Sequence, residues 1–172
     1  MIRRMPDLRI DPPFVANERD MLCSFLDWYR QTLAVKCEGL TDEQLKERAV
    51  PPSPLSLLGL VRHMADVERI WFRRVLGAEE APPYYWGDTP DGDFHDLDSV
   101  SVQEAFANWQ AEIEHARTVV AAFPSLDDLS AGTRHGQKVT LRWILIHMIE
   151  EYARHCGHAD FLRERIDGVT GE

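Results

Sequence analysis

The segment TLRWILIHMIEEYARHCGHADFLRERIDG, Thr140 to Gly168, decides the fold of this chain. It has helical periodicity from Thr140 to about Ile166, and Asp167-Gly168 then ends the helix. Its central part, His147 to His158, holds three histidines and two glutamates. Titratable groups on a buried helix face are costly unless something binds them. The segment therefore predicts a long core helix with a candidate site on one face.

Three further segments have the periodicity of long amphipathic helices. Asn17–Lys36 carries an apolar stripe and is followed by Gly39, which ends the helix. Ser56–Gly77 begins with a capping serine and ends at a glycine. Ser101–Phe123 is followed by Pro124. Together with the last helix, these segments predict an all-α four-helix bundle with a long crossover loop between helices two and three.

The connections between these helices differ in length and chemistry. Thr41–Gln44 has the pattern of a capping box and predicts a short helical turn, whereas Pro51–Pro54 excludes helix. Helices two and three are joined by Ala81–Val100, APPYYWGDTPDGDFHDLDSV. A connection of this length is usually a lid, a binding loop or disordered, and its aromatics Tyr84–Trp86 favour an ordered loop. Only the region around Gly136–Thr140 offers a short strand.

Length and composition favour one globular domain over residues 1–172, with 44% hydrophobic and 28% charged residues. Its 29 acidic and 19 basic residues give a net charge of −10, which argues against nucleic acid and anionic membrane as partners. No apolar run approaches the ~18 residues that span a bilayer, and MIRRMPDLRIDPPF lacks the apolar core of a secretory signal. The three cysteines form no CxxC pair, so we predict a cytoplasmic protein.

Three residues of the last helix have the spacing of metal ligands. His147, Glu151 and His155 are successive members of one stripe, and each adjacent pair suits one metal ion. The outer two lie about 12 Å apart at a rise of 1.5 Å per residue, too far to share one ion with the middle residue. A metal site therefore needs one pair from this helix and a ligand from another. Spacing leaves both pairs open, and it leaves open a role for His158.

His63 is the best candidate for the ligand from another helix, because it lies on the core-facing side of the second helix. The remaining histidines fall in the acidic loop, in a charged stretch of helix three and in the GTRHGQK turn: His95, His115 and His135. Two imidazoles and one carboxylate bind a divalent metal and leave a position open for water or substrate. The alternative interpretation is that these are hydrogen-bonded core histidines and that the Glu–His pair is a helix contact.

Two motifs together resemble a known superfamily. Leu55–Phe72, LSLLGLVRHMADVERIWF, paired with Thr140–Gly168, resembles the DinB/YfiT-like metal-binding four-helix superfamily, and the resemblance runs from about Glu18 to Gly168. The chain looks closest to the actinobacterial branch of mycothiol-dependent enzymes, which includes maleylpyruvate isomerase-like and mini-circle proteins. The resemblance implies a DinB/YfiT-like bundle and a metal held by the positions that match the superfamily's ligands: His63, Glu151 and His155.

The chain differs from many relatives at two positions of the last helix, Glu151 and His158. Many members have His where this chain has Glu151, and the mycothiol-dependent maleylpyruvate isomerase branch is similar in having the His-Glu-His set. His158 falls where many relatives carry Gln. His147, one turn before Glu151, is then expected to lie around the ligands, as is His158. Asp66, three residues after His63, is a candidate to orient an imidazole, unless it pairs with a neighbouring arginine.

Two arginines and one cysteine follow the proposed ligands. Arg163 and Arg165 are candidates to hold an anionic group of a thiol cosubstrate or an acidic substrate. The alternative is that they are solvated side chains that balance nearby carboxylates. Cys156 directly follows His155, but a helix turns by about 100° per residue, so Cys156 points away from the ligand stripe. We predict that it is a small buried side chain.

The resemblance implies thiol chemistry. A divalent metal, zinc first and nickel as the alternative, would present mycothiol as a thiolate. We therefore predict a metal-dependent thiol S-transferase, or a thiol-assisted enzyme, that acts on a small electrophile. Relatives often pair through bundle faces, which implies a homodimer. The alternatives are a non-enzymatic metal-binding stress-response protein and a hydrolase that uses metal-bound water with Glu150 or His147 as base.

Overall fold

The computed structural model describes residues 9–87 and 91–171, so residues 1–8, 88–90 and 172 lie outside the description. Most of the N-terminal stretch MIRRMPDLRIDPPF and part of the long connection fall in those gaps. The predicted all-α class is confirmed: within the described ranges there are helices and no strand. The strand expected near 136–140 is reduced to two isolated β-bridges, Leu129–Thr140 and Arg134–Gln137. No helix in these ranges is long and apolar enough to cross a membrane.

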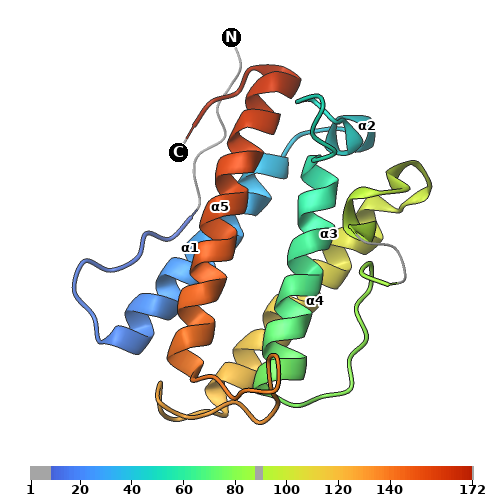
Figure 1. Ribbon diagram of the computed structural model, residues 1–172. Helices are drawn as coiled ribbons and strands as arrows, with labels where there is room; N and C mark the ends of the chain where they lie inside the picture. Colours follow the sequence, from blue (N-terminus) through green and yellow to red (C-terminus); the bar gives the residue numbers. More distant parts are fainter. Residues whose placement is uncertain (1–8, 88–90, 172) are drawn as a thin grey trace.

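Four long helices lie side by side in Figure 1: α1 (Glu18–Cys37), α3 (Leu57–Glu68), α4 (Val102–Ala121) and α5 (Leu141–Asp167). A short helix, α2 (Asp42–Lys46), lies between α1 and α3 in the chain. Helix α1 packs against α5 and α3 packs against α4, while α3 also contacts α1 and α5. The inward faces of these helices contribute to one buried apolar cluster. The helix boundaries agree with the predicted ones to within two residues, apart from the end of the second helix.

Side-chain caps set where these helices begin, as the sequence pattern indicated. Asn17, Ser56 and Thr140 each accept a hydrogen bond from the backbone N–H three residues later. Thr41 forms a full capping box with Gln44, because each side chain bonds the other residue's backbone N–H. Helix α5 ends at Gly168, where φ is 76°, a left-handed conformation that glycine adopts without strain.

The second predicted helix changes its winding halfway. The prediction of a regular helix to Gly77 is wrong beyond Glu68, because Arg69–Leu76 (η1) is π-helical. The loop before α5 bonds a backbone carbonyl near the C-terminal end of η1: Gly132 donates its N–H to Val75 O at 2.9 Å. A β-carbon on Gly132 would lie 2.2 Å from the carbonyl oxygen of Arg74, so only glycine fits this contact. The π-helix is only eight residues long, and over that length the pattern of apolar residues does not distinguish a π-helix from an α-helix.

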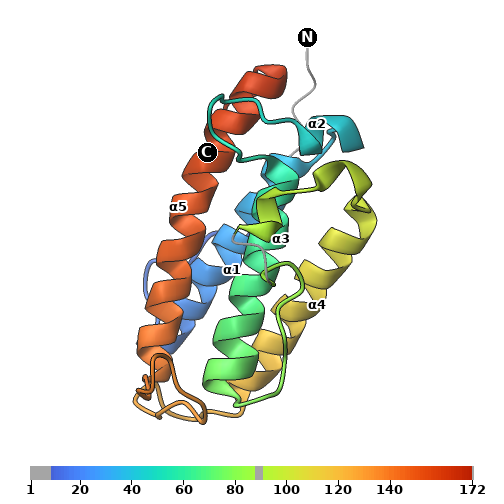
Figure 2. The same ribbon diagram turned by 45° about the vertical axis from the view of Figure 1, so that its right-hand side comes forward.

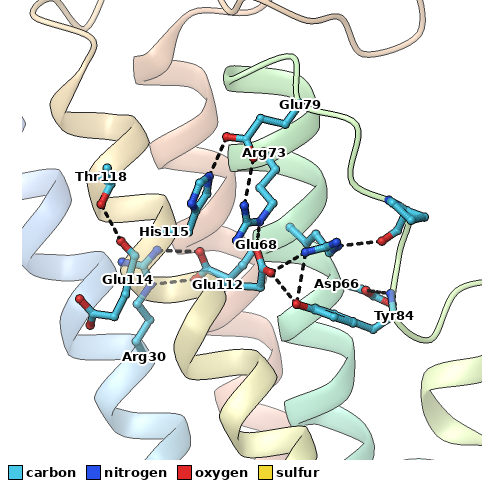
Figure 3. Close-up of polar contacts among 12 residues, drawn as sticks. Arg30, Asp66, Glu68, Arg73, Glu79, Tyr84, Glu112, Glu114, His115 and Thr118 are labelled. Carbon is cyan, nitrogen blue, oxygen red and sulfur yellow. Dashed lines mark hydrogen bonds and ion pairs between the residues drawn. The ribbon is translucent and has the colours of Figure 1, made fainter.

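The connection from η1 to α4 returns along the length of the packed helices. Figures 1 and 2 both show that α3 and α4 run in the same direction, so the chain must cross back before α4 begins. Short 3₁₀ turns at Gly92–Phe94 and Leu97–Ser99 lie in its second half. Its start is bonded to α4 and η1: Glu112, 1% exposed, accepts hydrogen bonds from Arg73 and Tyr84, while Glu79 accepts from Arg73 and His115 (Figure 3).

A buried hydrogen-bond network joins all four long helices. Arg30 of α1 forms a bidentate pair with Glu68 at the end of α3, with N–O distances of 2.8 and 2.7 Å (Figure 3). Tyr152 of α5 donates its hydroxyl to Glu68 at 2.7 Å and accepts from Trp109 Nε1 of α4 at 2.8 Å. Every charge and donor in this network therefore has a partner, as buried polar groups require. Since Tyr152 follows Glu151, the network also sets the orientation of α5 beside the candidate site.

Candidate metal centre

The packing of α3 against α5 brings the three predicted ligands together. His63, Glu151 and His155 each offer a donor atom, and these atoms lie within 4.8 Å of one another. The His63 and His155 rings are 4.5 Å apart between centroids, and His155 Nε2 lies 3.6 Å from Glu151 Oε2. The pair four residues apart on α5 therefore meets the histidine of α3 across the interface, as a site with ligands from two helices requires.

His63 is oriented by a carboxylate from the long connection. Its Nδ1 lies 2.7 Å from Asp93 Oδ2, which also accepts from Trp86 Nε1 at 2.6 Å. Burial opposes ionisation of Asp93, but the bonds from His63 and Trp86 outweigh it and lower the pKa of Asp93. An ionised carboxylate only accepts, so the contact places a proton on His63 Nδ1, and in the neutral imidazole Nε2 then carries the free lone pair. This arrangement is the usual support of a metal-binding imidazole.

His155, the second imidazole of the candidate site, lies beside another histidine. His158 Nδ1 lies 3.3 Å from His155 Nδ1, one turn further along α5. Burial, followed by the charges of His155 and Arg154, lowers the pKa of His158 and favours its neutral form. A contact at Nδ1 leaves His155 Nε2 on the side of Glu151. The structure thus places His158 beside a candidate ligand, where we expected it.

Glu151 stands between two histidines of its own helix. Its contact with His155 lowers the pKa of Glu151 most, and the charges of His147 and His63 add to this effect. His147 Nε2 lies 3.4 Å from Glu151 Oε1, so His147 also lies beside the ligands as expected. A second donor group, formed by His147, Glu150 and Glu151, comes from α5 alone, and Glu150 is exposed. The group with His63 fits a divalent metal better, because two helices supply an ionised carboxylate and two imidazoles.

Asp66 differs from its predicted role as an imidazole partner. Its carboxylate accepts three backbone hydrogen bonds, from the N–H groups of Tyr84, Tyr85 and Trp86, at 2.6 to 3.0 Å. Figure 3 shows Asp66 facing Tyr84 in the connecting segment. Burial raises the pKa of Asp66, and the three backbone bonds oppose this shift. Asp66 therefore holds the connection against α3, and Asp93 takes the position beside His63.

The predicted anion-binding arginines also lie elsewhere. Arg163 donates to the backbone oxygens of Lys36 and Glu38 at the end of α1, at 3.1 and 2.8 Å, and to Asp167. Its guanidinium is thus used to join α1 and α5. Arg165 is exposed, and neither arginine lines the cleft beside the ligands. The expectation that they hold a substrate or cosubstrate group is not met by these contacts.

A cleft of about 300 Å³ adjoins the candidate ligands. His63 and Glu151 line it on one side, and most of its remaining wall is aromatic or basic: Trp71, Trp86, Trp143, His147, Arg134 and His135. No sequence pattern pointed to Arg134, and the sequence placed His135 in a turn away from the site. The HG dipeptide at 135–136 marks that turn, but nothing in the sequence indicates that it packs on η1. Asp93 was missed as well, because it is one of several acidic residues in its loop.

A comparison with protein families identifies the chain. Residues 21–168 match the family described as mycothiol-S-transferase, and this range contains α1 to α5 almost completely. The search of curated proteins found no match. The matched range includes all three candidate ligands, the residues that support them and the adjoining cleft. The chain therefore belongs to the mycothiol-S-transferase family.

Proposed function

We propose that this protein binds a divalent metal through His63, Glu151 and His155 and transfers the thiol of mycothiol to a small electrophile. The observation that carries the proposal is the donor cluster itself, in which Asp93 leaves His63 Nε2 free beside an ionised carboxylate and a second imidazole. Membership of the mycothiol-S-transferase family supports the choice of thiol. When bound, the metal would supply a Lewis acid that keeps the thiol of the cosubstrate deprotonated near neutral pH.

The cysteines of the chain do not supply the reacting sulfur. Burial raises the pKa of Cys37 and of Cys156 to about 12. Cys23 is partly buried, and burial raises its pKa too. None of the three lines the cleft. Cys156 is 5% exposed and points its Sγ toward the carbonyl of Tyr29, which confirms the small buried side chain that we predicted. A thiol from a small molecule is therefore needed.

The protein's own groups have defined tasks in such a reaction. Asp93 keeps the proton of His63 on Nδ1, and the network around Tyr152 holds α5 in place. The aromatic walls beside Glu151 would reduce the contact of a bound acceptor with water. In a substitution, the thiolate sulfur forms the new S–C bond, the leaving group departs with the bonding electron pair, and the thiol proton passes to solvent.

The proposal includes the bundle type, the domain organisation, the identity of the metal, the oligomeric state and the location of the protein. We propose that the four long helices with their return connection form the four-helix bundle of the DinB/YfiT-like type, and that residues 1–172 make one domain. The apolar cluster shared by α1, α3, α4 and α5 supports both statements.

Zinc is the first candidate for the metal and nickel the second, since both accept imidazole and carboxylate ligands. A homodimer and a cytoplasmic location also remain predictions; the exposed apolar Ile146 and Phe161 on α5 support pairing, and the free cysteines support a reducing compartment.

Cobalt substitution tests the proposal directly. Purified protein is loaded with Co²⁺, mycothiol is added, and the sulfur-to-cobalt charge-transfer absorption is recorded together with consumption of a chromogenic alkylating electrophile. The proposal predicts that the absorption and the transfer activity occur together and that both are lost in His155→Ala. His115→Ala is the matched control, because His115 pairs with Glu79 away from the cleft.

Two outcomes of this experiment contradict the proposal. Cobalt that binds without any thiolate absorption would favour a metal-dependent hydrolase, in which water occupies the open position. A protein that takes up cobalt but transfers no thiol and, in a parallel assay with a chromogenic ester, shows no hydrolysis would favour the non-enzymatic alternative.

A further inference from the structure

We infer that the cleft beside the candidate metal centre selects acceptor substrates that are flat, apolar and negatively charged, such as small aromatic carboxylates. That these ligands are acceptor substrates rests on the proposed function, whereas the kind of ligand that binds follows from the residues of the cleft alone. The cleft has an aromatic wall, a cation that forms no ion pair with residues 9–87 or 91–171, and one carboxylate, that of Glu151, beside His63.

Three rings form the wall in mutual contact. Trp143 stacks on His147 with centroids 5.1 Å apart and an angle of 20° between the ring planes. Trp71 lies 4.5 Å from His147 and 5.1 Å from Trp143, at steeper angles. Trp71 is almost buried, whereas Trp143 is 48% exposed. An exposed tryptophan stacked at the edge of a cleft offers a flat apolar face, and aromatic or other planar ligands bind such faces well.

Arg134 supplies the charge. Its guanidinium lies 5.5 Å from the Trp71 ring centroid and lines the same cleft. Among residues 9–87 and 91–171, no carboxylate forms a salt bridge with it, in contrast to Arg69 and Arg73, which both bond Glu112. A guanidinium in this state has its planar set of donors available for a carboxylate of a ligand.

The turn that carries Arg134 is held firmly. Arg134 and Gln137 exchange backbone hydrogen bonds of 2.8 and 3.0 Å, and the two residues between them, His135 and Gly136, have φ values of 51° and 77°. These are the features of a tight two-residue hairpin turn with positive φ at both positions. Gly132 bonds the end of η1 just before this turn. The turn therefore presents Arg134 at a defined place above Trp71.

The charges of the cleft give an acceptor one orientation. In the metal-free protein, the carboxylate of Glu151 beside His63 repels an anionic group, and Arg134 attracts it. The ring of the acceptor then lies along the tryptophans, with its reactive carbon toward the candidate ligands. At about 300 Å³, the cleft is at the small end of the ~300–1,000 Å³ range of ligand pockets. This size suits an acceptor of one or two fused rings.

The test is an equilibrium binding measurement that needs no turnover. Naphthoate and its neutral isostere naphthamide are titrated into the full-length protein by calorimetry, once after zinc loading and once after treatment with a chelator. We expect naphthoate to bind about fivefold to tenfold more tightly than naphthamide in both states, as a charge-assisted hydrogen bond provides. Arg134→Gln should remove this preference and leave naphthamide binding unchanged. Arg165→Gln, an exposed arginine of α5 outside the cleft, is the control.

A second variant tests the wall. Trp143→Ala should weaken both ligands by a similar factor, because it removes a stacking face and no charge. The inference is overturned if naphthoate and naphthamide bind equally, or if the preference survives Arg134→Gln. A preference that vanishes only after chelation would mean that the carboxylate binds the metal instead. Because the chelated protein is measured separately, failure of the proposed metal function and failure of the cleft inference give different results.

Discussion

His63 Nδ1 and Asp93 Oδ2 lie 2.7 Å apart, although 30 residues separate them in the chain. The contact makes the connection between η1 and α4 a part of the candidate metal centre. Asp66 holds the first half of that connection through three backbone hydrogen bonds, and Asp93 holds His63 from its second half. The loop whose length predicts a lid or a binding loop thus positions a candidate ligand.

Removing the charge of Asp93 should weaken metal binding while leaving all three ligands in place. We expect Asp93→Asn to lower zinc affinity by about tenfold to a hundredfold, the usual effect of removing an outer carboxylate from a metal-binding histidine. Affinity is measured by competition with a chelating dye. Asp98→Asn makes the same charge change at an exposed position of the same connection and should bind zinc like the wild type. Equal affinity in both variants would show that Asp93 does not support the site.

Asp93 also predicts a pH dependence of stability in the metal-free protein. Its pKa in the folded state is lowered from 3.8, so ionised Asp93 stabilises the fold above that pH. This contribution is lost as the pH falls through the lowered folded-state pKa. The difference in free energy of unfolding between wild type and Asp93→Asn at pH 5 should shrink as the pH falls below about 4. Urea titrations at each pH measure it, and a difference that grows on acidification would contradict the assignment.

Cys156 should be dispensable for thiol transfer despite its place next to His155. Because its pKa is raised to about 12 and it is 5% exposed, native Cys156 should resist alkylation at pH 8 and react after unfolding. Mass spectrometry of peptides from alkylated protein checks this directly. Cys156→Ala should retain the transfer rate within about twofold, since it removes a small buried side chain that touches no reacting atom. A loss of activity with the metal retained would implicate the thiol in the reaction.

The buried network of Arg30, Glu68, Tyr152 and Trp109 should be a major source of stability. Glu68→Gln removes the buried counter-charge of Arg30 and leaves it only the partly exposed Asp27 at 2.9 Å. We expect a loss of about 3–5 kcal/mol in free energy of unfolding. Tyr152→Phe leaves the indole N–H of Trp109 unpaired and should cost about 1–3 kcal/mol. Urea denaturation with a shared m-value measures both. Effects below about 0.5 kcal/mol in either variant would contradict the network as described.

The sequence predicted those features that depend on local chemistry. Capping residues such as Thr140 and the stop at Gly168 placed the helix ends, and four-residue spacing together with the family resemblance selected Glu151 and His155. Features that depend on how distant segments meet were missed. Asp93 and Arg134 reach the site from loops whose path no periodicity reveals, and the π-helical turns of η1 are too short to alter the apolar pattern.

Arg163 shows the opposite error. Its nearness in sequence to the ligands suggested an anion-binding role, but two turns of helix carry it to the end of α1, where backbone carbonyls and Asp167 use its donors. Sequence position therefore placed Arg163 on the correct helix, but it did not reveal that the side chain contacts α1 and not the cleft.

The central claim is that His63, Glu151 and His155 hold one metal ion, and metal analysis of untagged protein tests it most directly. We predict about one divalent metal per chain in the wild type, and loss of that metal in His63→Ala, Glu151→Ala and His155→Ala. His147→Ala is the control: its imidazole lies beside Glu151 in the second donor group, so retained metal in this variant assigns the site to the group that includes His63. Wild-type protein that contains no metal after purification and reconstitution would contradict the claim and, with it, the proposed thiol transfer.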